Sequence, residues 1–162
     1  QCFLGHCEMV MAAIRDDVNS VLIFEDDVLL RDDYQERVSA CMRDLSFREW
    51  DVFYLGARLA EAPTPITPNL ASIANCSHTH AYALSRSGME WFMDTAAELA
   101  QRPSVQYFDV WMGAQPARKF MAYPIIAVQD SGYSDIQERT LSDDHYRDYE
   151  GMDEFWRHVE ER

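Results

Sequence analysis

Residues 21–30 read Val-Leu-Ile-Phe-Glu-Asp-Asp-Val-Leu-Leu, so an uninterrupted apolar run is followed at once by three carboxylates. The run of β-branched, aliphatic and aromatic residues predicts a strand that is covered on both faces, as in the sheets of α/β proteins. Open α/β sheets bind their ligands beyond the carboxyl ends of the strands. The acidic residues therefore stand where a ligand site is expected.

The acidic residues Glu25, Asp26 and Asp27 predict a metal site. On extended backbone, alternate side chains point to opposite sides, so Glu25 and Asp27 should converge while Asp26 points elsewhere. Carboxylate oxygens suit Mg²⁺ or Mn²⁺, which retains waters and bridges substrate phosphates. The alternative is a solvated turn, but carboxylates enclosed by apolar sequence are costly to bury unless a cation offsets their charge.

Helical and strand patterns alternate along the rest of the chain. This order predicts a mixed α/β domain with helices packed on a central sheet. Helices are expected over residues 3–15, from Asp33 to about residue 45, from Ser85 or Ser87 to about residue 100, and briefly from Phe108 to Met112; further strands are expected over residues 51–55, 79–84 and 124–128.

The first two helices carry specific expectations. Apolar residues at spacings of three and four predict one buried face on each helix. Asp33 followed by Glu36 predicts a capping box at the start of the second helix. The residues of the buried faces are Phe3, Leu4, Cys7, Val10, Met11 and Ile14 on the first helix, and Tyr34, Val38, Cys41, Met42 and Leu45 on the second.

Residues 1–162 are expected to form a single domain, because this length can bury one sizeable core but is short for two. Residues 60–78 contain three prolines and no hydrophobic period, which predicts a mobile loop that orders over bound ligand. The polar and aromatic residues 140–162 are expected to be a peripheral tail.

The formal net charge of −14, from 28 acidic and 14 basic residues, argues against nucleic acid as a partner, because a basic surface supplies most of the affinity for phosphate backbones. No segment approaches the roughly 20 apolar residues of a transmembrane helix. The four cysteines contain no CxxC pair, so reduced, partly buried thiols are expected in place of a structural zinc site.

Several motifs occur in a fixed order along the chain, at residues 2–6, 21–30, 53–56 and 79–88, Asp109, Gln129 and residues 134–136. This order resembles glycosyltransferase family 25, which includes bacterial lipooligosaccharide galactosyltransferases and collagen β-galactosyltransferases. The family's opening pattern Gly-Cys-x-x-Ser-His resembles residues 2–6, although Gln1 and Gly5 depart from it. The family also places a strand before this pattern, and we expect the chain to lack that strand.

The resemblance implies a GT-A type fold, that is, an α/β nucleotide-binding core with a divalent metal, a UDP-sugar donor and inversion at the anomeric carbon. By the same resemblance Asp27 would face the cation, Asp26 the ribose and Glu25 the sugar. Asp109 would accept the proton of the acceptor hydroxyl, with a helix N-cap as the alternative for this residue.

Five further residues are candidates for binding the donor or substrate. They come from strand ends and from the family's C-terminal segment, and each also has a structural alternative, such as a surface ion pair for Arg58 or a core position for His80. His6 is expected to orient neighbouring loops through hydrogen bonds. The five candidates are Arg58, His80, Gln129, Ser134 and Asp135.

These patterns predict an enzyme that transfers a hexose, with galactose expected, from a UDP-sugar to a hydroxyl of a glycan or glycolipid, as in lipopolysaccharide biosynthesis. Mn²⁺ or Mg²⁺ is the expected cofactor, and the cytoplasm, at the inner face of the membrane, is the expected location, with the ER lumen as the alternative. A non-catalytic interaction module of the same fold is the second hypothesis. A Mg²⁺-dependent phosphoryl-transfer enzyme fits the acidic residues but leaves residues 80–88 and Asp109 unexplained.

Overall fold

The computed structural model describes residues 2–102, 107–130, 133–134 and 139–140. Four helices are present among these residues: α1 (Cys2–Arg15), α2 (Tyr34–Leu45), α3 (Arg86–Ala100) and α4 (Phe108–Ala114). The strands are β1 (Ser20–Phe24), β2 (Val28–Leu30), β3 (Val52–Tyr54), β4 (Arg58–Leu59), β5 (Thr64–Pro65), β6 (Leu70–Ser72), β7 (Cys76–Ser77), β8 (Ala81–Ser85), β9 (Lys119–Ala122), β10 (Ala127–Gln129), β11 (Tyr133–Ser134) and β12 (Arg139–Thr140).

A mixed six-stranded sheet with the order β1-β8-β3-β9-β6-β5 forms the centre of the fold. β3 and β9 pair in parallel, whereas β1 and β8, β8 and β3, β9 and β6, and β6 and β5 pair antiparallel. β2 and β10 form a separate antiparallel pair. The predicted α/β class with a mixed sheet flanked by helices, consistent with a GT-A-like fold, is therefore confirmed.

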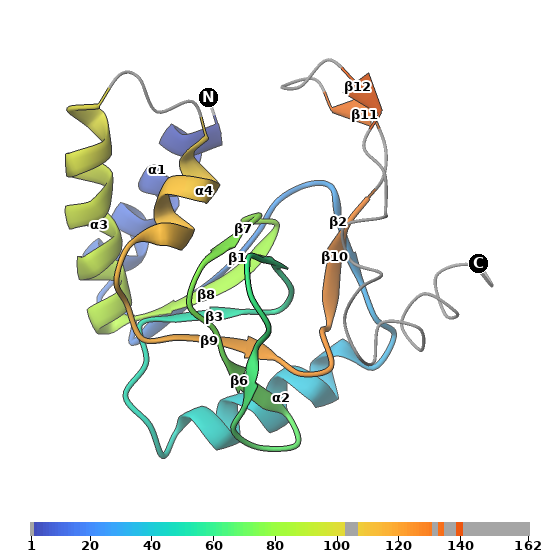
Figure 1. Ribbon diagram of the computed structural model, residues 1–162. Helices are drawn as coiled ribbons and strands as arrows, with labels where there is room; N and C mark the ends of the chain where they lie inside the picture. The colour runs from blue at the N-terminus through green and yellow to red at the C-terminus, as the bar shows by residue number, and fades with distance from the viewer. Residues whose placement is uncertain (1, 103–106, 131–132, 135–138, 141–162) are drawn as a thin grey trace.

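Helices cover both faces of this sheet (Figure 1). On one face, α1, α3 and α4 pack on alternate strand residues, including Ile23, Tyr54, Tyr82 and Met121. On the opposite face, α2 packs on the residues between them, including Phe53. Because successive strand residues point to opposite faces, the two helix layers bury two separate apolar cores.

β1 lies at the edge of the six-stranded sheet, so the expectation of a strand covered on both faces is wrong. Ile23 is buried, but Leu22 and Phe24, on the opposite face, are 41% and 39% exposed. The covering helix α2 packs over Ala83 of β8 and Phe53 of β3, one and two strands further in. A short apolar run has the same composition at the edge of a sheet as at its centre, so the sequence did not distinguish them.

The predicted helices are confirmed, with corrections to two of their details. On α1, the buried face contains His6, Cys7, Val10 and Ala13, whereas Leu4 and Met11 are 62% and 48% exposed. The helical period fits both sets of residues, and the packing of α1 on β1 and α3 selects one of them.

The predicted capping box of α2 does not form. Asp33 occupies the N-cap position, but its side chain makes no capping hydrogen bond. Its carboxylate accepts hydrogen bonds from Arg31 Nε at 3.0 Å and Arg37 Nε at 2.7 Å. Two guanidinium donors therefore replace the backbone donors as partners of this carboxylate, since hydrogen bonds between charged groups are the stronger ones.

The segment predicted as a loop contains strands β5, β6 and β7, and two of them belong to the six-stranded sheet. β6 pairs with β9, and Leu70 and Ala71 are fully buried. Strands of two or three residues are too short to show a hydrophobic period, which is why the pattern of residues 60–78 predicted a loop. The predicted tail, residues 140–162, lies outside the described residues apart from Thr140.

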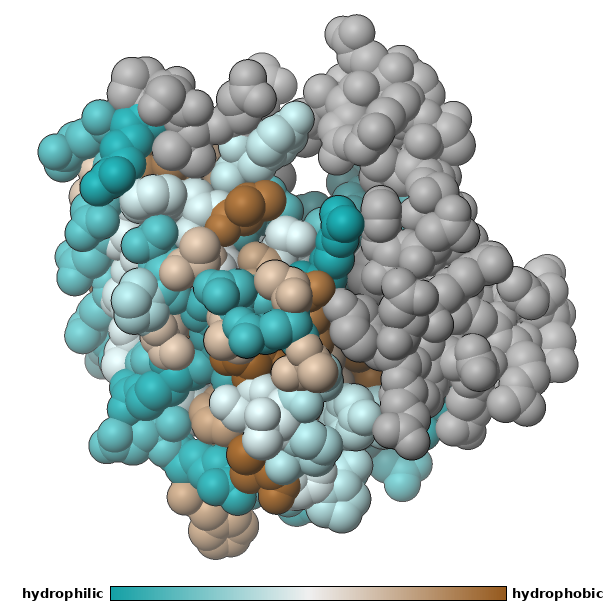
Figure 2. Space-filling view, viewed as in Figure 1, coloured by the Kyte–Doolittle hydropathy of each residue, from teal (hydrophilic) through white to brown (hydrophobic). Residues whose placement is uncertain are grey.

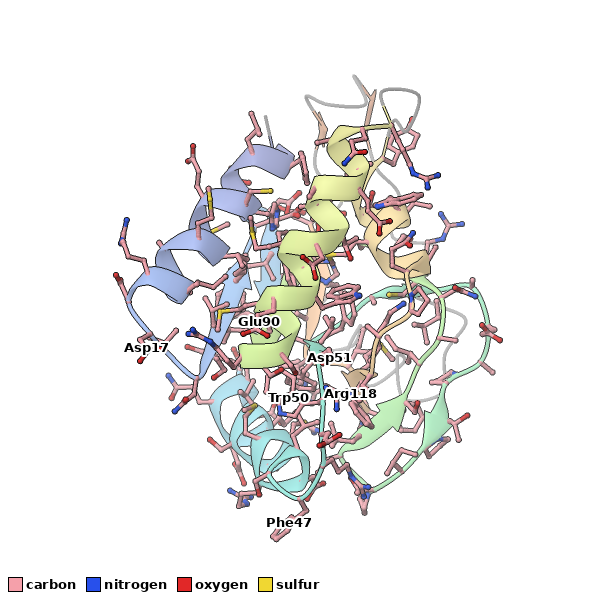
Figure 3. The ribbon with its side chains drawn as sticks, turned by 90° about the vertical axis from the view of Figure 1, so that its left-hand side faces the viewer. Asp17, Phe47, Trp50, Asp51, Glu90 and Arg118 are labelled. Carbon is pink, nitrogen blue, oxygen red and sulfur yellow. The ribbon has the colours of Figure 1, made fainter. Side chains whose placement is uncertain are left out.

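Ser85 ends β8 and begins α3, as predicted. Its hydroxyl accepts a hydrogen bond from Gly88 N at 3.0 Å and donates one to Trp50 O at 2.6 Å. Asp51 lies beside this junction and binds Arg118 through both carboxylate oxygens, at 2.6 and 2.9 Å (Figure 3). This ion pair joins the segment that precedes β3 to the segment that leads into β9, and Ser87 in the first turn of α3 donates a hydrogen bond to Asp51 Oδ1 at 2.8 Å.

The described surface mixes polar and apolar residues (Figure 2). Cys7, Cys41 and Cys76 are buried free thiols, as expected from the cysteine spacing. None of the described helices has the length and apolar character needed to cross a membrane.

Candidate functional site

Residues 78–80, which connect β7 to β8, hold two of the predicted carboxylates. Thr79 Oγ1 donates a hydrogen bond to Glu25 Oε1 at 2.6 Å, and the backbone N–H of His78 donates one to Asp109 Oδ2 at 2.9 Å. The backbone N–H of Glu25 donates to His80 O at 2.9 Å. The acidic run after β1 and the first turn of α4 are therefore anchored on the same short connector.

Glu25 also binds His6 on the buried face of α1. His6 Nε2 lies 3.2 Å from Glu25 Oε1, and His6 Nδ1 lies 2.8 Å from the Tyr82 hydroxyl. The imidazole stacks on the Tyr82 ring and contacts the ring of Phe108 in α4. Burial alone would raise the pKa of Glu25, but the hydrogen bonds from His6 and Thr79 outweigh burial and hold this pKa below its ordinary value.

Asp27 has different partners from Glu25. Its Oδ2 accepts a hydrogen bond from Gln129 Nε2 at 2.6 Å, and its backbone carbonyl accepts one from Asp130 N at 2.7 Å. Its Oδ1 is buried and has no hydrogen-bond partner among the described residues. Burial raises the pKa of Asp27 in spite of the Gln129 hydrogen bond, and the neighbouring charges of Glu25 and Asp26 add to this rise.

The acidic run is not extended, so the expected alternation of its side chains is wrong. Asp26 and Asp27 form a turn between β1 and β2, in which Val28 N lies 3.4 Å from Glu25 O. The turn leaves Asp26 exposed, directs Glu25 to His6 and Thr79, and directs Asp27 to Gln129. No three His, Cys, Asp or Glu residues of the described chain form a metal-binding group.

Asp109 lies in the first turn of α4 but is not its N-cap. The N-cap is Tyr107, which makes no side-chain capping bond. The Asp109 carboxylate instead accepts a hydrogen bond from the backbone N–H of His78. His78 has a φ of 71°, which is in the left-handed region. The N-cap alternative for Asp109 is therefore wrong, and the carboxylate is held at His78, the residue before the one that binds Glu25.

His80 is fully buried, so in this arrangement it acts on a ligand only through its neighbours. Its Nε2 lies 3.4 Å from Ala127 O. Gly56 packs against both groups: a Cβ atom at this position would lie 3.4 Å from His80 Nε2 and only 1.9 Å from Ala127 O. Burial, with the nearby His78, lowers the pKa of His80 to about 4. His80 is therefore neutral near pH 7 and occupies a core position, the structural alternative for this residue.

The remaining candidates are distributed over several places. Gln129, at the end of β10, reaches Asp27 as described above. Arg58 is exposed on β4, which pairs with β7, and its side chain makes no ion pair within the described part of the chain. Ser134 belongs to β11, and Asp135 lies outside the described residues.

Sequence reasoning missed Thr79, Tyr82 and Lys119. Thr79 and Tyr82 fall inside the motif of residues 79–88 but show no periodic or chemical signal of their own. Lys119 begins β9, a strand that the sequence pattern did not predict. Contacts between distant segments, which no local pattern records, give these three residues their roles.

The chain is similar in sequence to known proteins. The family model described as glycosyltransferase family 25 (LPS biosynthesis protein) matches residues 1–64. Over 128 residues, 75% of the chain, the sequence is 25% identical to "Inactive glycosyltransferase 25 family member 3" of Mus musculus and 25% identical to the human protein of that name. It is 23% identical to "Probable inactive glycosyltransferase 25 family member 3" of Bos taurus.

The aligned region spans 22% of the length of each of these relatives. The matched residues 1–64 contain α1, the acidic run and β3, and the longer similarity is to proteins that are themselves named as inactive. The predicted resemblance of this chain to glycosyltransferase family 25 is therefore confirmed.

Proposed function

We propose that the chain carries donor-binding and catalytic residues of a metal-dependent inverting glycosyltransferase, which moves a hexose, here galactose, from a UDP-sugar to a hydroxyl of a glycan or glycolipid. The observation that supports this most is the anchoring of Glu25 and Asp109 on the adjacent residues Thr79 and His78. It attaches to two adjacent residues the carboxylates to which the family resemblance gives sugar-facing and proton-accepting roles.

Asp27 fits the cation that this function requires. Its buried Oδ1 has no hydrogen-bond partner among the described residues, and an anionic oxygen in that state is costly unless a cation or donor is bound. Mg²⁺ and Mn²⁺ need few protein ligands, because they keep waters and bind substrate phosphates. We assign Asp27 as the ligand of this cation and Gln129 as the residue that positions the Asp27 carboxylate. The ion, when bound, would neutralise the donor diphosphate.

Asp109 would act on the acceptor. A carboxylate within hydrogen-bonding reach of the attacking hydroxyl can take its proton as the new bond to the sugar forms. The His78 backbone N–H fixes one oxygen of Asp109, and Thr79, the next residue of the same connector, donates a hydrogen bond to Glu25. The acid–base chemistry and the sugar contact would then share one rigid support.

A non-catalytic module is the second candidate, and one observation favours it. The relatives over 128 residues are named as inactive, and one oxygen of Asp109 already serves to hold a backbone N–H. Under this hypothesis the same residues would maintain the fold and bind a partner, without transferring a sugar.

Isothermal titration of UDP into the chain tests donor binding. With Mn²⁺ present we expect binding at least about tenfold tighter than with a chelator, because the cation screens the diphosphate from the acidic protein. Asp27→Asn should remove the difference, whereas the exposed Asp16→Asn should keep it. Equal affinity with and without Mn²⁺ would contradict the metal-dependent function, and binding without transfer by the full-length protein would favour the module.

A further inference from the structure

Lys119 is a buried cation for which the proposed function has no direct use. Its side chain is in the core, with 4% of the residue exposed, and its ammonium donates hydrogen bonds to Gly113 O and, at 2.9 Å, to Ala74 O. These bonds go to backbone carbonyls, not to a carboxylate. Burial lowers the pKa of Lys119, so keeping this charge inside the protein has a cost.

The two carbonyls belong to segments that meet at the C-terminal end of α4. Gly113 lies in the last turn of this seven-residue helix, where carbonyls have no intrahelical partner. Gln115 satisfies two of them, through its backbone N–H to Met112 O and its side chain to Trp111 O, each at 3.2 Å. Lys119 binds the Gly113 carbonyl, at the end of the helix dipole that favours a cation.

α4 has two further contacts with residues 74–78. A Cβ atom at Gly113 would lie 1.8 Å from Cys76 O, so the absence of a side chain allows α4 to approach β7 closely. At the other end of α4, Asp109 accepts the hydrogen bond from His78 N. A helix of seven residues is unstable alone, so its position depends on these tertiary contacts.

We propose that Lys119 is a positioning residue for Asp109. By tying Gly113 to Ala74, its ammonium fixes α4 against residues 74–78 at the separation at which the Asp109 carboxylate meets the His78 N–H. The catalytic importance of this arrangement rests on the proposed function, whereas the arrangement itself does not.

A neutral side chain of the same length would fill the space but could not replace the ammonium. Methionine would leave the Ala74 and Gly113 carbonyls buried without their donor, and an unsatisfied buried acceptor is costly. The cheapest relief is a shift of α4 away from residues 74–78, which would bring water to the two carbonyls and draw Asp109 away from His78.

Hydrogen exchange measured by NMR tests this proposal. In Lys119→Met, the His78 amide should lose protection by about tenfold relative to the Ala83 amide in β8, because its hydrogen bond to Asp109 is weakened. Lys119→Gln, which retains a donor for one carbonyl, should restore part of that protection. Asp109→Ala should give the same loss of His78 protection. The double variant with Lys119→Met should lose little more, since both substitutions act on the same hydrogen bond between His78 and Asp109.

Asp51→Asn is the matched control, because it weakens the ion pair with Arg118, which directly precedes Lys119 in the chain, and leaves both hydrogen bonds of the Lys119 ammonium in place. An equal relative loss of His78 protection in Asp51→Asn, or no loss in Lys119→Met, would overturn the proposal; if Lys119→Met does not fold, Lys119→Gln is judged by the same criterion.

In the full-length protein, Lys119→Met should lower kcat with little change in KM for the donor. Absence of UDP binding would refute the proposed function and leave the exchange result to decide the role of Lys119.

Discussion

At the scale of single residues, the candidate site depends on side chains that satisfy one another. His6 is buried between Glu25 and Tyr82, and Thr79 shares the Glu25 oxygen to which His6 binds. The hydrogen bonds keep Glu25 ionised in spite of its burial. A change at any of these residues therefore leaves another polar group without its partner.

Replacing His6 tests this network. We expect His6→Leu to lower the free energy of unfolding by about 1–3 kcal/mol, because the Glu25 carboxylate and the Tyr82 hydroxyl both lose a partner. His6→Gln can still donate to Glu25 and should lose about half as much. Urea denaturation at pH 7 measures both, and equal stabilities of the leucine variant and the wild type would show that the network contributes nothing.

Asp109 allows catalysis to be separated from structure. Asp109→Asn keeps an acceptor for the His78 N–H but removes the basic carboxylate, so turnover should fall by roughly 10²–10⁴ with donor affinity little changed. Asp109→Ala should lose turnover and also lower the melting temperature. If the asparagine variant of the full-length protein transfers sugar within a few-fold of wild type, Asp109 has only a structural role.

At the scale of elements, glycines set how closely helices approach strands. A Cβ atom at Gly88, in the first turn of α3, would lie 1.9 Å from Asp51 O. At Gly5 in α1, a Cβ atom would have no neighbour within 4 Å. The same substitution should therefore have opposite effects on these two helices.

Gly88→Ala should destabilise the protein by about 1–3 kcal/mol, because α3 must move away from the segment that precedes β3. Gly5→Ala should instead stabilise it by about 0.5–1 kcal/mol, because alanine loses less conformational entropy in a helix. Thermal or urea unfolding of both variants checks the pair. A neutral Gly88→Ala would mean that α3 does not pack as closely as described.

At the scale of the whole molecule, hydrogen-bonded carboxylates make stability dependent on pH. Hydrogen bonds from Arg118 lower the pKa of Asp51 to about 2. For Asp33, burial would raise the pKa, but hydrogen bonds from Arg31 and Arg37 outweigh burial and lower the pKa to about 2. Both groups have a lower pKa folded than unfolded, so their stabilisation is present above about pH 4 and is lost as the pH falls towards 2. Asp27, whose pKa is raised, opposes this trend.

Urea unfolding between pH 6 and pH 2 should therefore show a falling midpoint below about pH 4. Asp51→Asn should be less stable than wild type at pH 6, because asparagine cannot bind Arg118 as an ion, and the difference should shrink towards pH 2. A constant difference across this range would mean that the Asp51 charge does not contribute to folding.

The sequence by itself determined the α/β class, the four helices, strands β1, β3 and β8, and the relationship to glycosyltransferase family 25. Local patterns record these features, because hydrophobic period, capping residues and motif order are properties of contiguous sequence. The candidates Glu25, Asp27 and Asp109 were found in the same way.

Only the tertiary structure decided where these elements and candidates stand. β1 lies at an edge because pairing with β8, not composition, places it there. Asp109 binds His78, Glu25 binds Thr79, and Lys119 binds α4, all through contacts between segments that are distant in the chain. Such contacts depend on which faces pack together, and a one-dimensional pattern does not specify that choice because the same period fits several packings.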